Sequence, residues 1–269
     1  TTLLIAACSD STPTESKSEP LHHIYTTVYP LQFLTEELAG DLVRVESIYP
    51  AGTDEHSFEP TQKDMMKLAE ADDVFYIGHH LESFIPKAKK SLQNEEVTFH
   101  AIGEMIDESL LLESGAHHHD EHDGHDEHDS HGHAHGDIDP HLWITPKLGQ
   151  QLATNIHAQL LTLLPNDKET LDANLKRVVK QLDTLDQQYK EMSQQAQSKT
   201  FFVSHAAFGY LAHDYNLEQV AIAGINSQSE PSQKQLAELV ALAKEKNIQD
   251  IFFEQNVSSK LTEVIQKEI

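Results

Sequence analysis

Histidines and carboxylates are concentrated in one short stretch of this chain. Nine of the nineteen histidines fall within it, eight carboxylates lie between Asp120 and Asp139, and no Lys or Arg occurs from His117 to Thr145. The stretch offers almost nothing apolar to bury, so it cannot form a packed core. Imidazoles and carboxylates that repeat every two or three residues favour loose capture of transition-metal ions over the alternative of a solvated acidic linker. The expected capturing residues of this loop, 116–136, are His117, His118, His119, His122, His125, His128, His131, His133 and His135.

Three further histidines occupy positions where α/β proteins build their sites. His56 follows a β-branched run, His205 directly follows the apolar run 201–204, and His141 lies in the segment Asp-Pro-His-Leu-Trp. Sites in parallel sheets form at or beyond the carboxyl ends of strands. One histidine at a strand end is usually structural. Three of them, distributed over both halves of the chain and one beside the histidine-rich loop, predict metal ligands.

The elements that must position these histidines follow from the hydrophobic pattern. Strands rich in β-branched and aromatic residues are predicted at 24–29, 43–49, 74–77, 97–102, 200–204, 218–222 and 250–253. Helical patterns are predicted at 31–39, 61–70, 81–92, 145–164, 206–214, 232–246 and 258–268. This alternation predicts an α/β fold with two lobes, each a mostly parallel sheet flanked by helices.

A single long helix is predicted between the lobes. Apolar residues recur at spacings of four and three from Leu171 to Ala196, without Gly or Pro between Asn166 and Thr200. A helix of about thirty residues would span roughly 45 Å at about 1.5 Å per residue. A coiled-coil dimer seam is the alternative, but α/β patterns on both sides favour a rigid helix that lies against two lobes. The expected domains are a tether at 1–20, an N-terminal lobe at 21–164, a linking helix at 165–198 and a C-terminal lobe at 199–269.

Charge and composition restrict the partners. The 269 residues carry a formal net charge of −25, which excludes nucleic acid as a partner because the phosphate backbone requires a basic face. The same charge attracts cations and favours a soluble monomer.

The start of the chain resembles a lipoprotein signal. Its only cysteine, Cys8, ends the run Leu3-Leu4-Ile5-Ala6-Ala7, which is similar to the lipobox in which cleavage leaves a lipid-bearing cysteine. No apolar run beyond Pro20 approaches the length of a membrane span. We therefore expect an extracytoplasmic protein anchored to the bacterial membrane by lipid at Cys8. Both ends are expected to be truncated, because the chain starts without Met and stops without a closing strand.

Four motifs together resemble the zinc-specific solute-binding lipoproteins of bacterial ABC importers. The motifs are Gly52-x-x-x-His56-x-Phe58-Glu59-Pro60, Asp139-Pro140-His141-Leu142-Trp143, Ser204-His205-x-Ala207-Phe208-Gly209-Tyr210 and Phe252-Phe253-Glu254-Gln255-Asn256. The resemblance extends from about His22 to the end and includes the histidine-rich insertion. It implies two lobes joined by one long helix, a metal held in the cleft between them by His56, His141 and His205, and a membrane permease as partner.

Coordination chemistry independently favours zinc. Three neutral imidazoles with one oxygen ligand form a tetrahedral site suited to Zn²⁺, whereas Mn²⁺ prefers more carboxylate oxygens. In the related manganese receptors, the residue at the position matching His205 looks like a glutamate. A histidine at this position therefore favours zinc. In some relatives a later carboxylate completes the site, but this chain ends before that region. Glu55 is then the best candidate for the fourth ligand, and water is the alternative.

Two other functions fit parts of this pattern. Three histidines and an open position also describe a zinc hydrolase, but the chain has no HExxH helix and no nucleophile elbow. A metal-buffering extracellular adhesin is hard to separate from a receptor by sequence.

Trp143 is expected to pack beside the site and limit solvent access. Surface, strand-edge or otherwise satisfied positions are expected for the histidines at 22, 23, 100, 157 and 213. His79 and His80 follow a strand and could line the cleft, but they are not expected to bind the metal.

Overall fold

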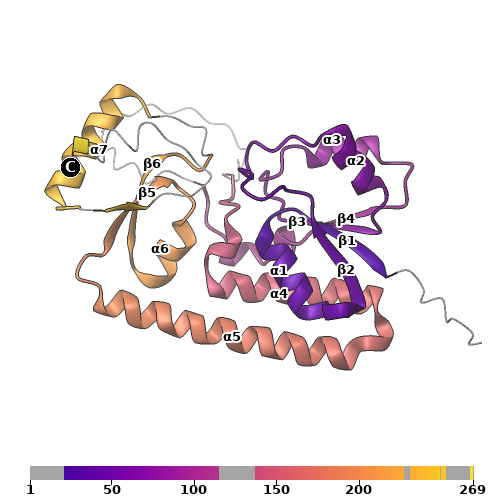
Figure 1. Ribbon diagram of the computed structural model, residues 1–269. Coiled ribbons are helices and arrows are strands. Elements are labelled where there is room, and N and C mark those ends of the chain that lie inside the picture. The colour runs from indigo at the N-terminus through magenta and orange to yellow at the C-terminus, as the bar shows by residue number, and fades with distance from the viewer. Residues whose placement is uncertain (1–20, 115–136, 227–230, 249, 253–266, 269) are drawn as a thin grey trace, which may run out of the picture.

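Two lobes lie side by side on one long helix in the computed structural model (Figure 1). The structure describes residues 21–114, 137–226, 231–248, 250–252 and 267–268. Cys8, the nine histidines of the loop and Glu254 lie outside these residues. Among the described residues, no helix is both long enough and apolar enough to cross a membrane. The predicted domain boundaries remain predictions.

The N-terminal lobe contains a parallel sheet with the order β2-β1-β3-β4. Its strands are β1 (His22–Thr26), β2 (Val43–Ser47), β3 (Asp73–Tyr76) and β4 (Thr98–Ala101). Side chains alternate between two cores, because successive residues of a strand point to opposite faces. Ile24 and Phe75 pack toward α1 (Tyr29–Ala39) and the helices below it, whereas Val74 and Tyr76 pack toward α2 (Gln62–Ala69) and α3 (Ile85–Ser91). This sheet, covered on both faces, confirms the predicted α/β architecture.

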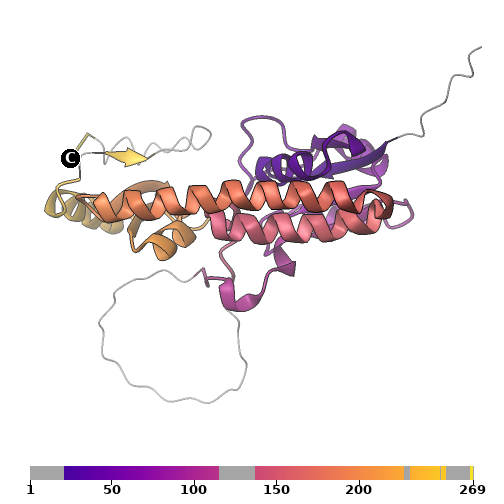
Figure 2. The same ribbon diagram turned by 90° about the horizontal axis from the view of Figure 1, so that it is seen from below.

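The long helix α5 (Lys168–Gln195) spans 28 residues and extends beneath both lobes. It follows α4 (Pro146–Leu163) after the short 3₁₀ turn η5 (Pro165–Asp167), and the two helices lie side by side (Figure 2). A Cβ added at Gly149 of α4 would lie 3.6 Å from Leu182 of α5, in ordinary van der Waals contact. Leu171 and Val178 of α5 are buried in the core of the N-terminal lobe. The first part of the apolar stripe of α5 therefore packs against its own chain, as predicted, whereas Leu185 and Met192 further along the stripe are exposed.

The C-terminal lobe is built on a second parallel sheet, with the order β6-β5-β7 among the described residues. Its strands are β5 (Thr200–His205), β6 (Glu218–Ala223) and β7 (Ile251–Phe252). Helix α6 (Gly209–Tyr215) lies between this sheet and α5, and α7 (Gln233–Glu245) lies on the other side of the sheet (Figure 1). Four other 3₁₀ turns are η1 (Gly40–Leu42), η2 (Gly103–Met105), η3 (Glu108–Leu110) and η4 (Leu142–Ile144).

Side chains cap the starts of α2, α4 and α7, whereas α1, α3, α5 and α6 begin without a side-chain cap. Thr61 caps α2 through a reciprocal bond pair with Asp64, and Thr145 caps α4. The helix predicted at 81–92 was too long, since α3 begins only at Ile85. Glu82 instead turns inward, where its carboxylate accepts hydrogen bonds from the Thr27 hydroxyl at 2.7 Å and from the backbone of residues 77 and 78. These bonds satisfy a buried carboxylate but prevent an earlier helical turn.

Candidate metal centre

His56 lies in the loop that follows β2, above an aromatic cluster. The ring of Phe58 packs 4.7 Å from that of Tyr49 and 5.4 Å from that of Phe84, measured between centroids. The Asp54 carboxylate accepts the backbone N–H of His56 at 2.9 Å, which forms a local turn. The phenylalanine of the Gly-x-x-x-His-x-Phe motif therefore anchors the loop that presents the histidine two residues earlier.

His141 is fully buried and its ring is oriented by Asp139. The Oδ1 atom of Asp139 accepts hydrogen bonds from Nδ1 of His141 at 2.7 Å and from its backbone N–H at 3.0 Å. With the proton held on Nδ1, the lone pair on Nε2 points away from the carboxylate and can bind a cation. Trp143 packs beside the imidazole, with ring centroids 5.6 Å apart, as predicted.

His205 enters from the other lobe. It is the last residue of β5, is 1% exposed, and pairs in register with Ala223 of β6. The carboxyl end of a central parallel strand is where the topology places ligand-binding side chains. His205 thereby brings a C-terminal-lobe imidazole to the two from the N-terminal lobe.

The structure brings together the residues predicted to bind metal. Glu55, His56, His141 and His205 each offer one ligand atom, and these four atoms lie within 4.8 Å of one another. The imidazole centroids of His56, His141 and His205 are 5.1 to 5.7 Å apart, and the Nε2 atoms of His56 and His141 are 3.1 Å apart. A tetrahedral zinc ion with Zn–N bonds of about 2.0–2.1 Å would separate its ligand nitrogens by about 3.4 Å. The cluster thus has the size and the donor atoms of a zinc site.

The electrostatics of the cluster favour a neutral imidazole at His56. Burial, together with repulsion from His141 and His205, lowers the pKa of His56 from 6.5 to about 4. Neutral imidazole is the form that coordinates metal.

The remaining described histidines have other environments. His22 and His100 both contact the buried carboxylate of Asp73 through Nε2. Burial raises the pKa of Asp73, but hydrogen bonds from His100 and His22 outweigh that effect and hold it below its usual range. His157 bonds to Asp172 at 2.9 Å, and the side chain of His213 is exposed. His79 and His80 follow β3 at positive φ and are not members of the four-residue cluster.

Sequence reasoning assigned no role to two residues that support the site. Asp139 orients His141, and the Asp-x-His spacing was the available signal for that contact. Tyr210 donates a hydrogen bond to the backbone oxygen of Asp139 at 2.8 Å from the other lobe. Its motif was visible in the sequence, but the contact spans 71 residues and depends on tertiary structure.

This chain is similar in sequence to a known protein family and to individual zinc-binding proteins. The profile of the ZnuA family, described as zinc-uptake complex component A, periplasmic, matches residues 24–269. The zinc-binding lipoprotein AdcA of Streptococcus pneumoniae (strain ATCC BAA-255 / R6) is 38% identical over 267 residues, which cover 99% of this chain and 51% of AdcA. The high-affinity zinc uptake system protein ZnuA of Bacillus subtilis (strain 168) is 38% identical over 270 residues, which cover 99% of this chain and 82% of that protein. The chain therefore spans about half the length of AdcA.

The fold is also similar to a solved structure. The crystal structure of the Streptococcus pneumoniae AdcAII protein superposes with a TM-score of 0.79 at 29% sequence identity. The match covers 93% of this chain and 86% of that chain. The similarity therefore includes both lobes and the long helix.

Acidification should destabilise the metal-free protein through His56. Unfolded His56 takes up a proton near pH 6.5, whereas folded His56 does so only near pH 4. This contribution to stability is fully present above about pH 6.5 and is lost as the pH falls toward the folded pKa. We expect a loss on the order of 2 kcal/mol in the free energy of unfolding by pH 4.5, from the size of the shift. Urea unfolding in chelator across this range would measure it.

A His56→Gln variant is the control for this measurement, because other groups titrate in the same pH range. Its stability should fall less steeply with acid than that of the wild type. Parallel pH profiles for the two proteins would contradict the assignment of a depressed pKa to His56.

Proposed function

Because this chain belongs to the ZnuA family of zinc-uptake components, we propose that it is an extracytoplasmic zinc receptor of an ABC importer. It captures Zn²⁺ between its lobes and delivers the ion to a membrane permease. The observation that carries the proposal is the convergence of three imidazoles and one carboxylate, contributed by both lobes, within 4.8 Å.

The donor set supports zinc as the cargo. His56, His141 and His205 are the proposed nitrogen ligands, and Glu55 supplies the proposed oxygen. Imidazole nitrogen suits Zn²⁺, whereas Mg²⁺ and Ca²⁺ are bound by oxygen ligands. The carboxylate of Glu55 and the neighbouring carboxylate of Asp139 together offset the two positive charges of the ion. In this role the site binds and releases the ion without a chemical reaction.

The two-lobe arrangement supports capture and release. Two ligands belong to the N-terminal lobe and His205 belongs to the C-terminal lobe, so a small separation of the lobes would remove a ligand from the ion. A permease that favours the separated arrangement would thereby lower the affinity for zinc.

We propose that the loop at 116–136 raises the local concentration of ions through weak binding.

The family description and the run that ends at Cys8 support the proposed location. The family description is periplasmic, and the AdcA relative is a lipoprotein. We propose that lipid on Cys8 anchors the protein to the outer face of the bacterial membrane, and that the protein acts as a monomer. The run that ends at Cys8 supports the anchor, and the net charge of −25 favours the monomer.

Removal of His205 should cost far more zinc affinity than removal of Glu55. If about 12 kcal/mol of binding is shared by four ligands, one ligand contributes roughly 3 kcal/mol, or about a hundredfold in affinity. We therefore expect a loss of at least a hundredfold for His205→Ala. Water can replace the oxygen of Glu55, so Glu55→Ala should lose less than about tenfold. Competition titration against a chromogenic zinc chelator measures both losses.

His213→Ala is the matched control, because it removes an exposed histidine from the same lobe. It should bind zinc as tightly as the wild type. Equal losses for His205→Ala and Glu55→Ala would contradict the ligand assignment.

Deletion of the loop should leave the tight site nearly intact. The residues flanking it are joined by the antiparallel bridge between Glu113 and Ile138, so a short Gly-Ser link in place of 116–136 preserves this bridge. Native mass spectrometry with zinc titration should show one tight ion in both proteins and fewer weakly bound ions in the deletion variant. Loading should slow only when zinc is scarce. Loss of the tight ion on deletion would require different ligands.

A further inference from the structure

The hydroxyl of Tyr210 joins three segments of the chain. It donates a hydrogen bond to the backbone oxygen of Asp139 at 2.8 Å and accepts one from the backbone N–H of Leu112 at 3.2 Å. Leu112 and Asp139 also bond to each other, since the N–H of Asp139 donates to the oxygen of Leu112 at 2.9 Å. We call these paired segments, 112–114 and 137–139, the neck. The tyrosine is 2% exposed, so its three-way junction is shielded from water.

This junction ties together the segments that carry two of the proposed zinc ligands. Asp139 orients the imidazole of His141, so a displacement of its backbone would also move that ring. Tyr210 lies in the first turn of α6, which begins four residues after His205. Its hydroxyl therefore bonds the N-terminal-lobe segment of His141 to the helix that follows His205.

The close approach of α6 to Asp139 is built into the sequence. A Cβ added at Gly209 would lie 2.8 Å from the Oδ2 atom of Asp139, which is too close for any side chain without a shift. Glycine at this position allows the start of α6 to reach the carboxylate that holds His141. Burial raises the pKa of Tyr210, so its phenol stays protonated and can donate at physiological pH.

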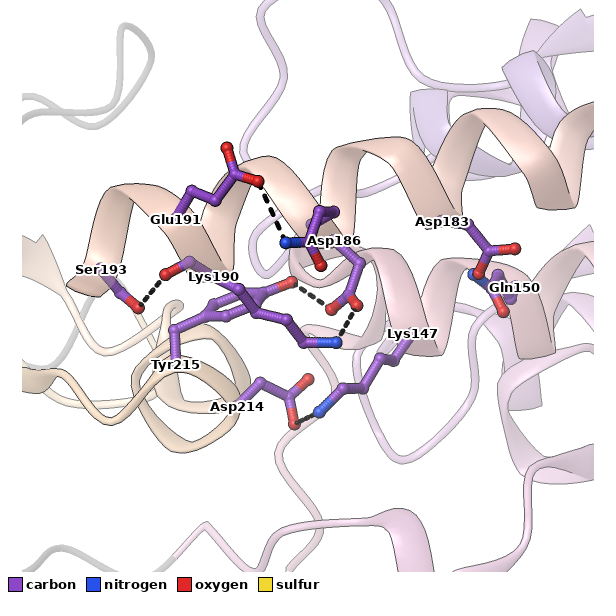
Figure 3. Close-up of polar contacts among 10 residues, drawn as sticks. Lys147, Gln150, Asp183, Asp186, Lys190, Glu191, Ser193, Asp214 and Tyr215 are labelled. Atoms are coloured by element: carbon purple, nitrogen blue, oxygen red, sulfur yellow. Dashed lines mark hydrogen bonds and ion pairs between the residues drawn. The ribbon is translucent and has the colours of Figure 1, made fainter. Parts of the chain in front are cut away.

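The other end of α6 is bonded to different elements (Figure 3). The hydroxyl of Tyr215 donates to Asp186 of α5 at 3.0 Å, and Asp214 pairs with Lys147 of α4 at 2.9 Å. Tyr215 also stacks on Tyr189 of α5 and is 4% exposed. Two buried tyrosines of one short helix thus use their hydroxyls in the same way, one toward the segment that carries a proposed ligand and one toward α5.

We propose that Tyr210 is a positioning residue for the metal centre, whose hydroxyl holds His141 and His205 in register across the lobes and couples zinc binding to the contact between α6 and the neck. The inference rests on the proposed zinc-binding function. Separation of the lobes breaks both bonds of Tyr210, which leaves polar groups of the neck without their partner. Because coupling between two equilibria is reciprocal, a contact that raises zinc affinity is itself stabilised by zinc.

The test compares Tyr210→Phe with Tyr215→Phe. Both substitutions remove one buried hydroxyl from α6 and keep the ring. We expect Tyr210→Phe to weaken zinc binding about tenfold and to speed zinc release, as the loss of one well-placed buried hydroxyl would do. Tyr215→Phe should lower the urea midpoint but leave zinc affinity within about twofold, because its partner Asp186 lies on α5. Competition titration and stopped-flow release measure these effects on the folded proteins.

Amide hydrogen exchange of the unsubstituted protein provides a second readout that does not depend on any variant folding. Zinc should slow exchange at the Leu112 amide, which donates to Tyr210, more than at the Ile102 amide, which bonds within the N-terminal sheet at 2.8 Å. In Tyr210→Phe the Leu112 amide should exchange faster and lose its response to zinc.

Three outcomes would overturn the inference. They are equal zinc affinity of Tyr210→Phe and wild type, equal losses for both tyrosine variants, and a zinc response at Leu112 no larger than at Ile102. Failure of the wild type itself to bind zinc tightly would instead overturn the proposed function, so the two failures are distinguishable.

Discussion

Three imidazoles held against one another in a largely buried site are the constraint on which the rest of this structure depends. Burial, together with repulsion from His141 and His205, lowers the pKa of His56 to about 4. A divalent ion can bind among these imidazoles, because the lone pairs of their neutral nitrogens coordinate its positive charge. The fold must therefore hold the nitrogens close while it leaves them neutral.

Rigid packing around the site meets this requirement. The Tyr49, Phe58 and Phe84 rings support the loop of His56, the Asp139 carboxylate fixes the ring of His141, and the central strand β5 ends at His205. Helix α5 packs against α4 and α1 in one lobe and contacts α6 in the other, so both lobes rest on the same helix. The site is consequently sensitive to the lobe arrangement, which is the property that a receptor needs to load and release its cargo.

Much of this organisation could be predicted from local pattern. Strand and helix alternation and the apolar stripe from Leu171 to Ala196 predicted the two lobes and the long helix, because these depend on periodicity. Of the three clustered histidines, His205 ends β5 and His56 lies in the loop after β2, whereas His141 precedes the turn η4 and follows no named strand of the described residues. Contacts between distant segments could not be predicted in this way. Glu82 turns into the core and delays α3 to Ile85, and Tyr210 bonds to a backbone oxygen 71 residues earlier. The Thr27 hydroxyl that bonds to Glu82 lies 55 residues earlier in the chain, and the partner of Tyr210 is a backbone oxygen, so no local motif reveals either contact.

The most direct test of the central claim is zinc K-edge X-ray absorption of the protein loaded with one equivalent of Zn²⁺. Our account predicts four ligands at about 2.0–2.1 Å, of which three are imidazoles and one is oxygen. The imidazole count should fall to two in His205→Ala. A spectrum with fewer than three imidazoles in the wild type, or one unchanged by that substitution, would contradict the claim that residues 56, 141 and 205 bind the same ion.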